Sequence, residues 1–116
     1  MEKKFKQKLT YDQRKQESTK VYTKYPGRVP IIVQKYHKCT LPDVDKCKYL
    51  VPKDMTMGQF LFVIRKRIKL EPSHALFITV NGTLVPAIQT VGEIYDSQKD
   101  EDGFLYVTYT NENTFG

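Results

Sequence analysis

The sequence lacks tryptophan, contains only two cysteines and has no long apolar run. Two cysteines, Cys39 and Cys47, are too few for a disulfide scaffold and favour the reducing cytoplasm. No apolar stretch approaches the roughly 18 residues that span a bilayer, and the N-terminus has no signal-peptide hydrophobic region. These absences predict a small cytoplasmic protein without a membrane-spanning segment.

What is present suits one folded domain. The chain has 116 residues, of which 40% are hydrophobic, and its eight tyrosines and six phenylalanines argue against a disordered polar chain. A chain of this length buries about two thirds of the surface that its unfolded form exposes. We therefore expect one hydrophobic core that needs no disulfide or metal to hold it.

Charge is distributed unevenly along the chain. Residues 1–69 hold 18 basic and 6 acidic side chains, whereas residues 70–116 hold one basic residue, Lys99, and seven acidic ones. The first part could face a nucleic acid, a membrane surface or an acidic peptide, and charge alone does not choose among the three.

Capping signals and apolar spacing predict the helices. Thr10 followed by Gln13 predicts a helix over residues 11–24, and Thr56 followed by Gln59 predicts the strongest one. A shorter helix is expected around Phe5. In the first long helix a thin apolar stripe is expected to dock on the core: Tyr11, Val21, Tyr22 and Tyr25.

Strand-like segments complete the predicted fold. They are residues 29–36, 48–52, 75–80, 83–85 and 104–109. The Asn81-Gly82 turn joins 75–80 to the short return strand 83–85. With a helix crossing a mixed sheet and a last strand beside the first, this order predicts an α+β protein with a β-grasp, or ubiquitin-like, core. We divide the chain into a helical extension (1–25), the core (26–110) and a flexible C-terminal tail (111–116).

Motifs for catalysis are missing. The sequence has no glycine-rich phosphate loop, no zinc-protease motif and no nucleophile elbow, so we expect no enzyme and no cofactor. His37, Cys39 and Cys47 lack a fourth ligand at zinc-site spacing, which favours two solvated loop thiols and no metal. The basic run 65–67 lies opposite the apolar helix stripe and has no RNA-binding signature beside it, so no nucleic-acid partner is expected.

The segment Lys48–Pro52 (KYLVP) is the most informative one. Its terminal proline favours an edge strand, and an unpaired edge can accept a strand from a peptide. An ordinary edge protected by lysines is an equally good interpretation of the pattern. The terminal Gly116 is also ambiguous: without a Cβ its carboxylate can enter a narrow channel and be transferred, yet a final glycine is common by chance.

Four segments closely resemble the autophagy ubiquitin-like modifiers, the family of autophagy-related protein 8, the GABA-receptor-associated proteins and light chain 3. They are KYPGRVPIIVQK, DKCKYLVPKDMTMGQFLFVIRKRI, ALFITVNGTLVP and DEDGFLYVTYTNENTFG. The resemblance covers essentially the whole chain. Lys24, Tyr25 and Asp54 make the chain more similar to the GABA-receptor-associated branch.

The resemblance implies a conjugation reaction in which the protein is the substrate. An E1-like enzyme would activate Gly116, an E2-like enzyme would carry it as a thioester, and the headgroup amine of phosphatidylethanolamine would receive it. A cysteine protease trims family precursors to this glycine and removes the lipid again. The implied location is the cytoplasm and, after lipidation, the autophagosome membrane, with delivery to the lysosome or vacuole.

The resemblance also implies a groove for cargo receptors that carry acidic aromatic-x-x-aliphatic motifs. The aromatic pocket would be formed by Glu17, Val21, Pro30, Ile32, Lys48, Leu50 and Phe104. The aliphatic pocket would be formed by Tyr49, Val51, Pro52, Met55, Phe60 and Val63. Acidic receptor residues would meet Arg28, Lys46, Lys48 and Arg67.

Two further implications concern other partners. Phe77 and Thr79 would lie in a surface that engages the protease and the E1-like enzyme, although many family members carry an aromatic residue in place of Thr79. An alternative function is an unconjugated peptide-binding adaptor in vesicle traffic or on tubulin, reached through the basic N-terminal helices.

Overall fold

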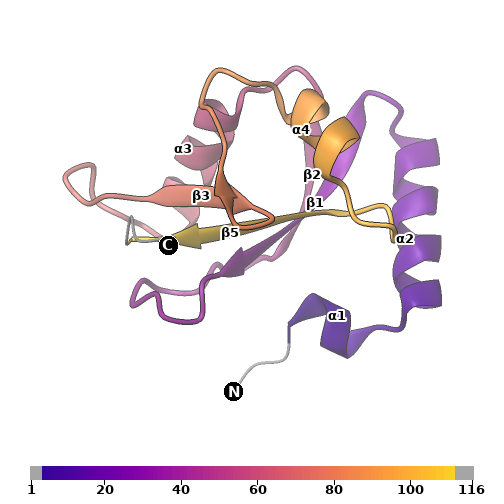
Figure 1. Ribbon diagram of the computed structural model, residues 1–116, viewed down its shortest axis with the longest axis horizontal. Helices are drawn as coiled ribbons and strands as arrows, with labels where there is room; N and C mark the ends of the chain where they lie inside the picture. Colours follow the sequence, from indigo (N-terminus) through magenta and orange to yellow (C-terminus); the bar gives the residue numbers. More distant parts are fainter. Residues whose placement is uncertain (1–3, 112–116) are drawn as a thin grey trace.

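The computed structural model describes residues 4–111. The helices are α1 (Phe5–Lys8), α2 (Tyr11–Lys24), α3 (Met57–Arg67) and α4 (Val91–Gln98). The strands are β1 (Arg28–Lys35), β2 (Lys48–Pro52), β3 (Phe77–Val80), β4 (Thr83–Leu84) and β5 (Leu105–Thr110). They form one sheet in the order β2-β1-β5-β3-β4, with β1 and β5 parallel at its centre (Figure 1). The predicted ubiquitin-like β-grasp fold with two additional N-terminal helices is confirmed.

The two faces of the sheet are covered by different helices. Leu105, Val107 and Tyr109 of β5 belong to the main core, which α3 and α4 complete on one face. Phe104 and Tyr106 lie in a smaller cluster with Phe5 of α1, on the opposite face. Figure 1 shows α3 and α4 on one side of the sheet and α1 on the other. The alternation predicted for the last strand therefore separates two hydrophobic layers.

Local signals determine where several elements begin and turn. Thr10 and Thr56 accept hydrogen bonds from Gln13 N and Gln59 N, so both predicted capping boxes form. The hairpin between β3 and β4 turns at Asn81 and Gly82, where φ is 52° and 79°. Positive φ at both residues is what a type I′ turn requires.

Helix α2 docks differently from the sequence prediction. The prediction that an apolar stripe docks α2 on the core is wrong. Tyr11, Tyr22 and Tyr25 are exposed, while Arg14 and Ser18 are buried. The buried polar side chains bond to Asp102, as described below, so hydrogen bonds within the protein compensate their removal from water. Polar contacts orient α2, and its tyrosines remain at the surface.

The prediction that both cysteines are solvated is half wrong. Cys47 is exposed, but Cys39 is only 7% exposed. A turn in which Cys39 N donates to Tyr36 O folds the segment back after β1, and Tyr36 N donates to Tyr109 O of β5. The turn therefore buries the Cys39 side chain. A buried free cysteine behaves as a small hydrophobic residue.

Candidate functional site

Strand β2 forms one edge of the sheet. It pairs with β1 in antiparallel register, from Arg28 opposite Pro52 to Ile32 opposite Lys48, and no other described strand lies beside it. The backbone groups on its outer side can therefore accept an additional strand from a peptide. The predicted edge position of this segment is confirmed.

The side chains of β2 alternate between the two faces of the sheet. Tyr49 and Val51 are buried in the main core, whereas Lys48 is exposed and Leu50 is half-buried. Leu50 lies opposite Pro30 on β1, and Lys48 lies opposite Ile32, so these four residues share the second face. A peptide at this edge would thus meet different side chains above and below it.

The residues predicted for the aromatic pocket come from the sheet and from α2. Phe104 lies in one cluster with Ile32, and α2 contacts β1. Glu17 of α2 forms an ion pair with Lys48 of β2, which joins the helix to the strand directly. Val21 follows Glu17 by four residues, on the same side of the helix, and is half-buried. The fold brings this predicted set together.

The residues predicted for the aliphatic pocket lie between β2 and α3. The rings of Tyr49 and Phe60 are nearly perpendicular, with centroids 5.8 Å apart. Met55 and Val63 are partly buried against the same cluster. Val51 is buried beside them in the main core, and Pro52 ends the strand half-buried. This second set is also brought together, on the opposite side of β2.

Basic side chains surround the edge, and some already have acidic partners. Lys46 Nζ and the Arg67 guanidinium lie 5.5 Å and 5.9 Å from the Tyr49 ring centroid. Arg67 Nη1 is 3.2 Å from Asp45 Oδ2, and Lys48 is paired with Glu17. Arg28 is exposed at the start of β1. An acidic peptide could replace the internal carboxylates as partner of these cations.

The Tyr49 hydroxyl is buried and has no hydrogen-bond partner within residues 4–111. Burial raises the pKa of this phenol, while the positive charge of Arg67 acts to lower it. The group therefore stays neutral at physiological pH. The next strand residue, Leu50, faces the other way, so the buried hydroxyl belongs to the aliphatic side of the edge.

The surface predicted around β3 needs a correction. Thr79 is only 3% exposed, so its side chain does not contribute to an open surface. Its neighbours are Leu84 on β4 and Thr108 on β5, because β3 lies between these two strands. Phe77, at the start of β3, is half-buried. Only Phe77 of this pair offers accessible side-chain surface.

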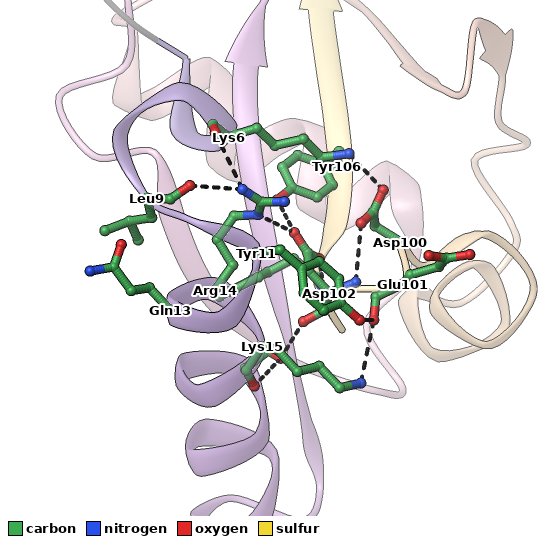
Figure 2. A network of polar contacts seen from close by, with 12 residues as sticks. Lys6, Leu9, Tyr11, Gln13, Arg14, Lys15, Asp100, Glu101, Asp102 and Tyr106 are labelled. Atoms are coloured by element: carbon green, nitrogen blue, oxygen red, sulfur yellow. Dashed lines mark hydrogen bonds and ion pairs between the residues drawn. The ribbon is translucent and has the colours of Figure 1, made fainter.

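A buried polar network that the sequence did not indicate joins α2 to the loop before β5 (Figure 2). Asp102, fully buried, accepts hydrogen bonds from Arg14 Nε at 2.8 Å and from the Tyr106 hydroxyl at 2.5 Å on Oδ2. Its Oδ1 accepts from Phe104 N at 2.9 Å. Burial and the neighbouring Asp102 carboxylate both raise the pKa of Tyr106, so this phenol remains the donor.

A metal-ion site and a membrane-spanning helix are both absent from the described part of the chain. Residues 4–111 contain no group of three or more His, Cys, Asp or Glu side chains that could hold a metal ion. No helix in this part is long and apolar enough to cross a membrane. Gly116, predicted as the conjugated residue, lies outside the described residues.

Comparisons with known proteins agree with this architecture. The family described as "Autophagy protein Atg8 ubiquitin like" matches residues 13–116. Autophagy-related protein 8 from Candida glabrata is 51% identical over 116 residues, which cover 100% of this chain and 98% of that protein. Autophagy-related protein 8B from Oryza sativa subsp. indica is 52% identical over 112 residues, 97% of this chain and 94% of the relative.

A solved structure gives the same result at the level of the fold. The crystal structure of Trypanosoma brucei ATG8 superposes with a TM-score of 0.91 at 43% sequence identity and full coverage of both chains. The proteins named here do not distinguish the GABA-receptor-associated branch, so that assignment stays a prediction. The family profile, the full-length relatives and the shared fold together establish that this chain belongs to the Atg8 family of autophagy ubiquitin-like proteins.

Proposed function

We propose that this protein is a ubiquitin-like modifier of autophagy that is conjugated through Gly116 to phosphatidylethanolamine. On the autophagosome membrane it recruits cargo receptors and adaptors that carry acidic aromatic-x-x-aliphatic motifs. Its partners are E1-like and E2-like enzymes, a trimming and delipidating cysteine protease, and the receptors. The protein moves from the cytoplasm to the membrane on lipidation and is delivered to the lysosome or vacuole.

The observation that carries the receptor part of this proposal is the unpaired edge of β2. It has Leu50 and Lys48 on one face and Tyr49 and Val51 on the other. Side chains that lie on opposite faces of an added peptide strand, such as the first and fourth of an aromatic-x-x-aliphatic motif, can each reach one of these sets. The surrounding cations favour acidic residues in the same peptide.

The receptor site is tested with the double substitution Tyr49→Ala with Leu50→Ala. We expect it to weaken an acidic aromatic-x-x-aliphatic peptide by about 2 kcal/mol or more, as central contact residues do. Titration calorimetry measures the affinity. Thr83→Ala with Leu84→Ala is the control at the other edge of the sheet, where both residues are exposed. Because Tyr49 is buried in the main core, the comparison is made at a temperature at which both variants are folded. Equal affinities for the two variants would place the peptide elsewhere.

The conjugation is tested by reconstitution. Incubation with cognate E1-like and E2-like enzymes, ATP and vesicles containing phosphatidylethanolamine should give a faster-migrating band that is lost when Gly116 is deleted. The Gly116 deletion should bind the receptor peptide normally, because the groove lies within residues 17–104. Absence of any conjugate under conditions that lipidate a relative would contradict the modifier and leave the unconjugated adaptor as the function.

A further inference from the structure

The buried network around Asp102 holds α2 at a defined position over the sheet. Arg14 donates from Nε to Asp102, and its Nη1 donates to the carbonyls of Lys6 and Leu9 at 3.2 Å and 2.8 Å. One guanidinium therefore links α1, α2 and the loop before β5 (Figure 2). Arg14 is 9% exposed, so water competes little for these bonds.

A second contact brings the backbone of the loop against α2. The Ser18 hydroxyl donates to Asp102 O at 2.5 Å. At Gly103 an added Cβ would lie 2.3 Å from Ser18 Oγ and 3.0 Å from Ser18 Cβ, and φ is +90°. A side chain at residue 103 would therefore require the Ser18 hydroxyl to give up its place, and with it the bond to Asp102 O, and would press on the Ser18 Cβ of α2. We call Arg14, Ser18, Asp102 and Gly103 the α2 anchor.

The residues of the α2 anchor are immediate neighbours of the aromatic pocket. On the helix, Ser18 follows Glu17 directly and precedes Val21 by three residues, less than one turn. In the loop, Gly103 directly precedes Phe104, whose backbone N–H is bonded to Asp102. The anchor therefore connects the helical wall of the pocket to its sheet side, through residues that do not themselves belong to the predicted pocket.

We propose that the α2 anchor determines the specificity of the aromatic pocket by setting the separation between α2 and the sheet. This inference rests on the proposed receptor groove. The four residues are positioning residues. They hold α2 at the distance from the sheet at which the aromatic pocket admits a large aromatic side chain. They do not affect the aliphatic pocket, which lies between β2 and α3. The chemistry they select in the partner is an aromatic ring at the first position of the motif.

The test compares two acidic peptides that differ only at the first motif position, Trp or Leu. Asp102→Asn keeps only one acceptor oxygen, so its amide NH2 must face either Arg14 and Tyr106 or Phe104 N, and in both orientations part of the anchor loses its acceptor. Gly103→Ala displaces the Ser18 hydroxyl and breaks its bond to Asp102 O, which loosens α2 on the sheet. Titration calorimetry should show the Trp-over-Leu preference of the unmodified protein falling by about tenfold in each variant. Replacing the aliphatic peptide residue with Ala should cost the same in every protein.

Gly82→Ala is the matched control for Gly103→Ala. Gly82 also has positive φ, +79°, but nothing lies within 4 Å of the position its Cβ would take. It therefore suffers similar backbone strain without moving α2. A merely structural role for the anchor would reduce binding of both peptides equally and leave the Trp-over-Leu ratio unchanged. An unchanged ratio in folded Asp102→Asn and Gly103→Ala, or an equal fall in Gly82→Ala, overturns the proposal.

Two outcomes require a further measurement: variants that do not fold, and an unmodified protein that binds neither peptide. If Asp102→Asn and Gly103→Ala do not fold, Ser18→Ala is the substitute variant. It removes the hydroxyl that donates to Asp102 O at 2.5 Å and that lies 3.1 Å from Lys15 O within the same helix. Its Trp-over-Leu ratio should fall by about threefold; an unchanged ratio overturns the proposal. If the unmodified protein binds neither peptide, the receptor groove is wrong. Nuclear Overhauser effects between α2 and β1, which are in contact, then test the anchor itself. They should weaken in Ser18→Ala and persist in Gly82→Ala, and equal effects in the two variants overturn the proposal.

Discussion

At the scale of single residues, two buried tyrosine hydroxyls have opposite environments. Tyr109 OH donates to Pro42 O at 2.6 Å, whereas Tyr49 OH has no partner within residues 4–111. A buried hydroxyl without a partner costs free energy, and one with a partner contributes to stability. The same chemical deletion should therefore have different results at the two positions.

We expect Tyr109→Phe to lower the free energy of unfolding by about 1 kcal/mol, because Pro42 O loses its donor. Tyr49→Phe should leave the free energy of unfolding unchanged or raise it by up to about 1 kcal/mol. Urea denaturation of both variants at neutral pH measures the difference. A loss in Tyr49→Phe as large as that in Tyr109→Phe would show that the Tyr49 hydroxyl has a bonding partner.

Asp100 gives a pH-dependent contribution. Burial acts to raise the pKa of its carboxyl, but hydrogen bonds from Lys6 and Asp102 N outweigh burial and lower the pKa. A carboxyl whose pKa is lower in the folded state stabilises the fold above its unfolded pKa of about 3.9. The contribution is lost as the pH falls through the folded pKa.

We therefore expect Asp100→Asn to be less stable than the unmodified protein at pH 6 to 7 and to approach it below about pH 4. Denaturation at both pH values measures this. In a Lys6→Met background the ion pair, 2.6 Å from Nζ to Oδ1, is absent, so the pH-dependent difference should shrink. The same difference with and without Lys6 would assign the pKa to another cause.

At the scale of elements, the start of α3 joins several parts of the protein. Thr56 Oγ1 accepts from Gln59 N at 3.1 Å, and Gln59 Oε1 accepts from Thr56 N at 2.9 Å. The next two backbone donors, Met57 N and Gly58 N, bond to the carbonyls of Gln89 and Ala87. The free N–H groups of the first turn are thus satisfied by the cap and by the loop before α4.

Thr56→Ala should lower the free energy of unfolding by about 1 kcal/mol, since the first turn loses its side-chain acceptor. Thr56→Ser keeps the acceptor oxygen and should lose much less. Thermal or urea denaturation of the two variants measures the cap. Similar losses would attribute the effect to the Thr56 methyl group.

Elements with local signals were predictable from the sequence. The capping boxes at Thr10 and Thr56 and the Asn81-Gly82 turn depend on neighbouring residues, so their structure follows from short patterns. The α2 interface was not predictable in this way. Arg14 and Asp102 are far apart in the sequence, and the helix buries polar groups where its tyrosines gave the stronger pattern.

The β2 edge, on which the proposed groove depends, was predictable because its signals lie in one strand. The terminal Pro52 and the alternation along residues 48–52 indicate an edge with two faces, and the structure has both. Burial of Thr79 and Cys39 was mispredicted, because it depends on the strands and turns that cover them. The residues that flank Thr79 or Cys39 in the sequence do not indicate which distant segments pack against these side chains.

At the scale of the whole molecule, the positive charge of residues 1–69 lies in the part that contains the β2 edge. Long-range attraction raises the rate at which an acidic peptide arrives and is screened by salt. We expect the association rate constant of an acidic receptor peptide to fall by about tenfold between 50 and 500 mM salt. Stopped-flow fluorescence measures both rate constants.

The dissociation rate constant should change much less, because contacts in the pockets are short-range. A peptide with its acidic residues replaced by Gln is the control and should associate at a nearly salt-independent rate. If salt instead accelerates dissociation while association stays constant, the cations form tight ion pairs in the complex and do not steer the encounter.

The parallel pair at the centre of the sheet has a consequence for how the protein is made. β1 pairs with β5, so Ile31 meets Leu105 from the far part of the sequence. Such non-local pairing forms late. A nascent chain on the ribosome can form the β1–β2 hairpin early, but it lacks the β5 partner of β1 and also Phe104 beside the groove until nearly all residues are synthesised. The proposed receptor groove would therefore be completed only near the end of translation, which would limit how long an incomplete chain could engage receptors.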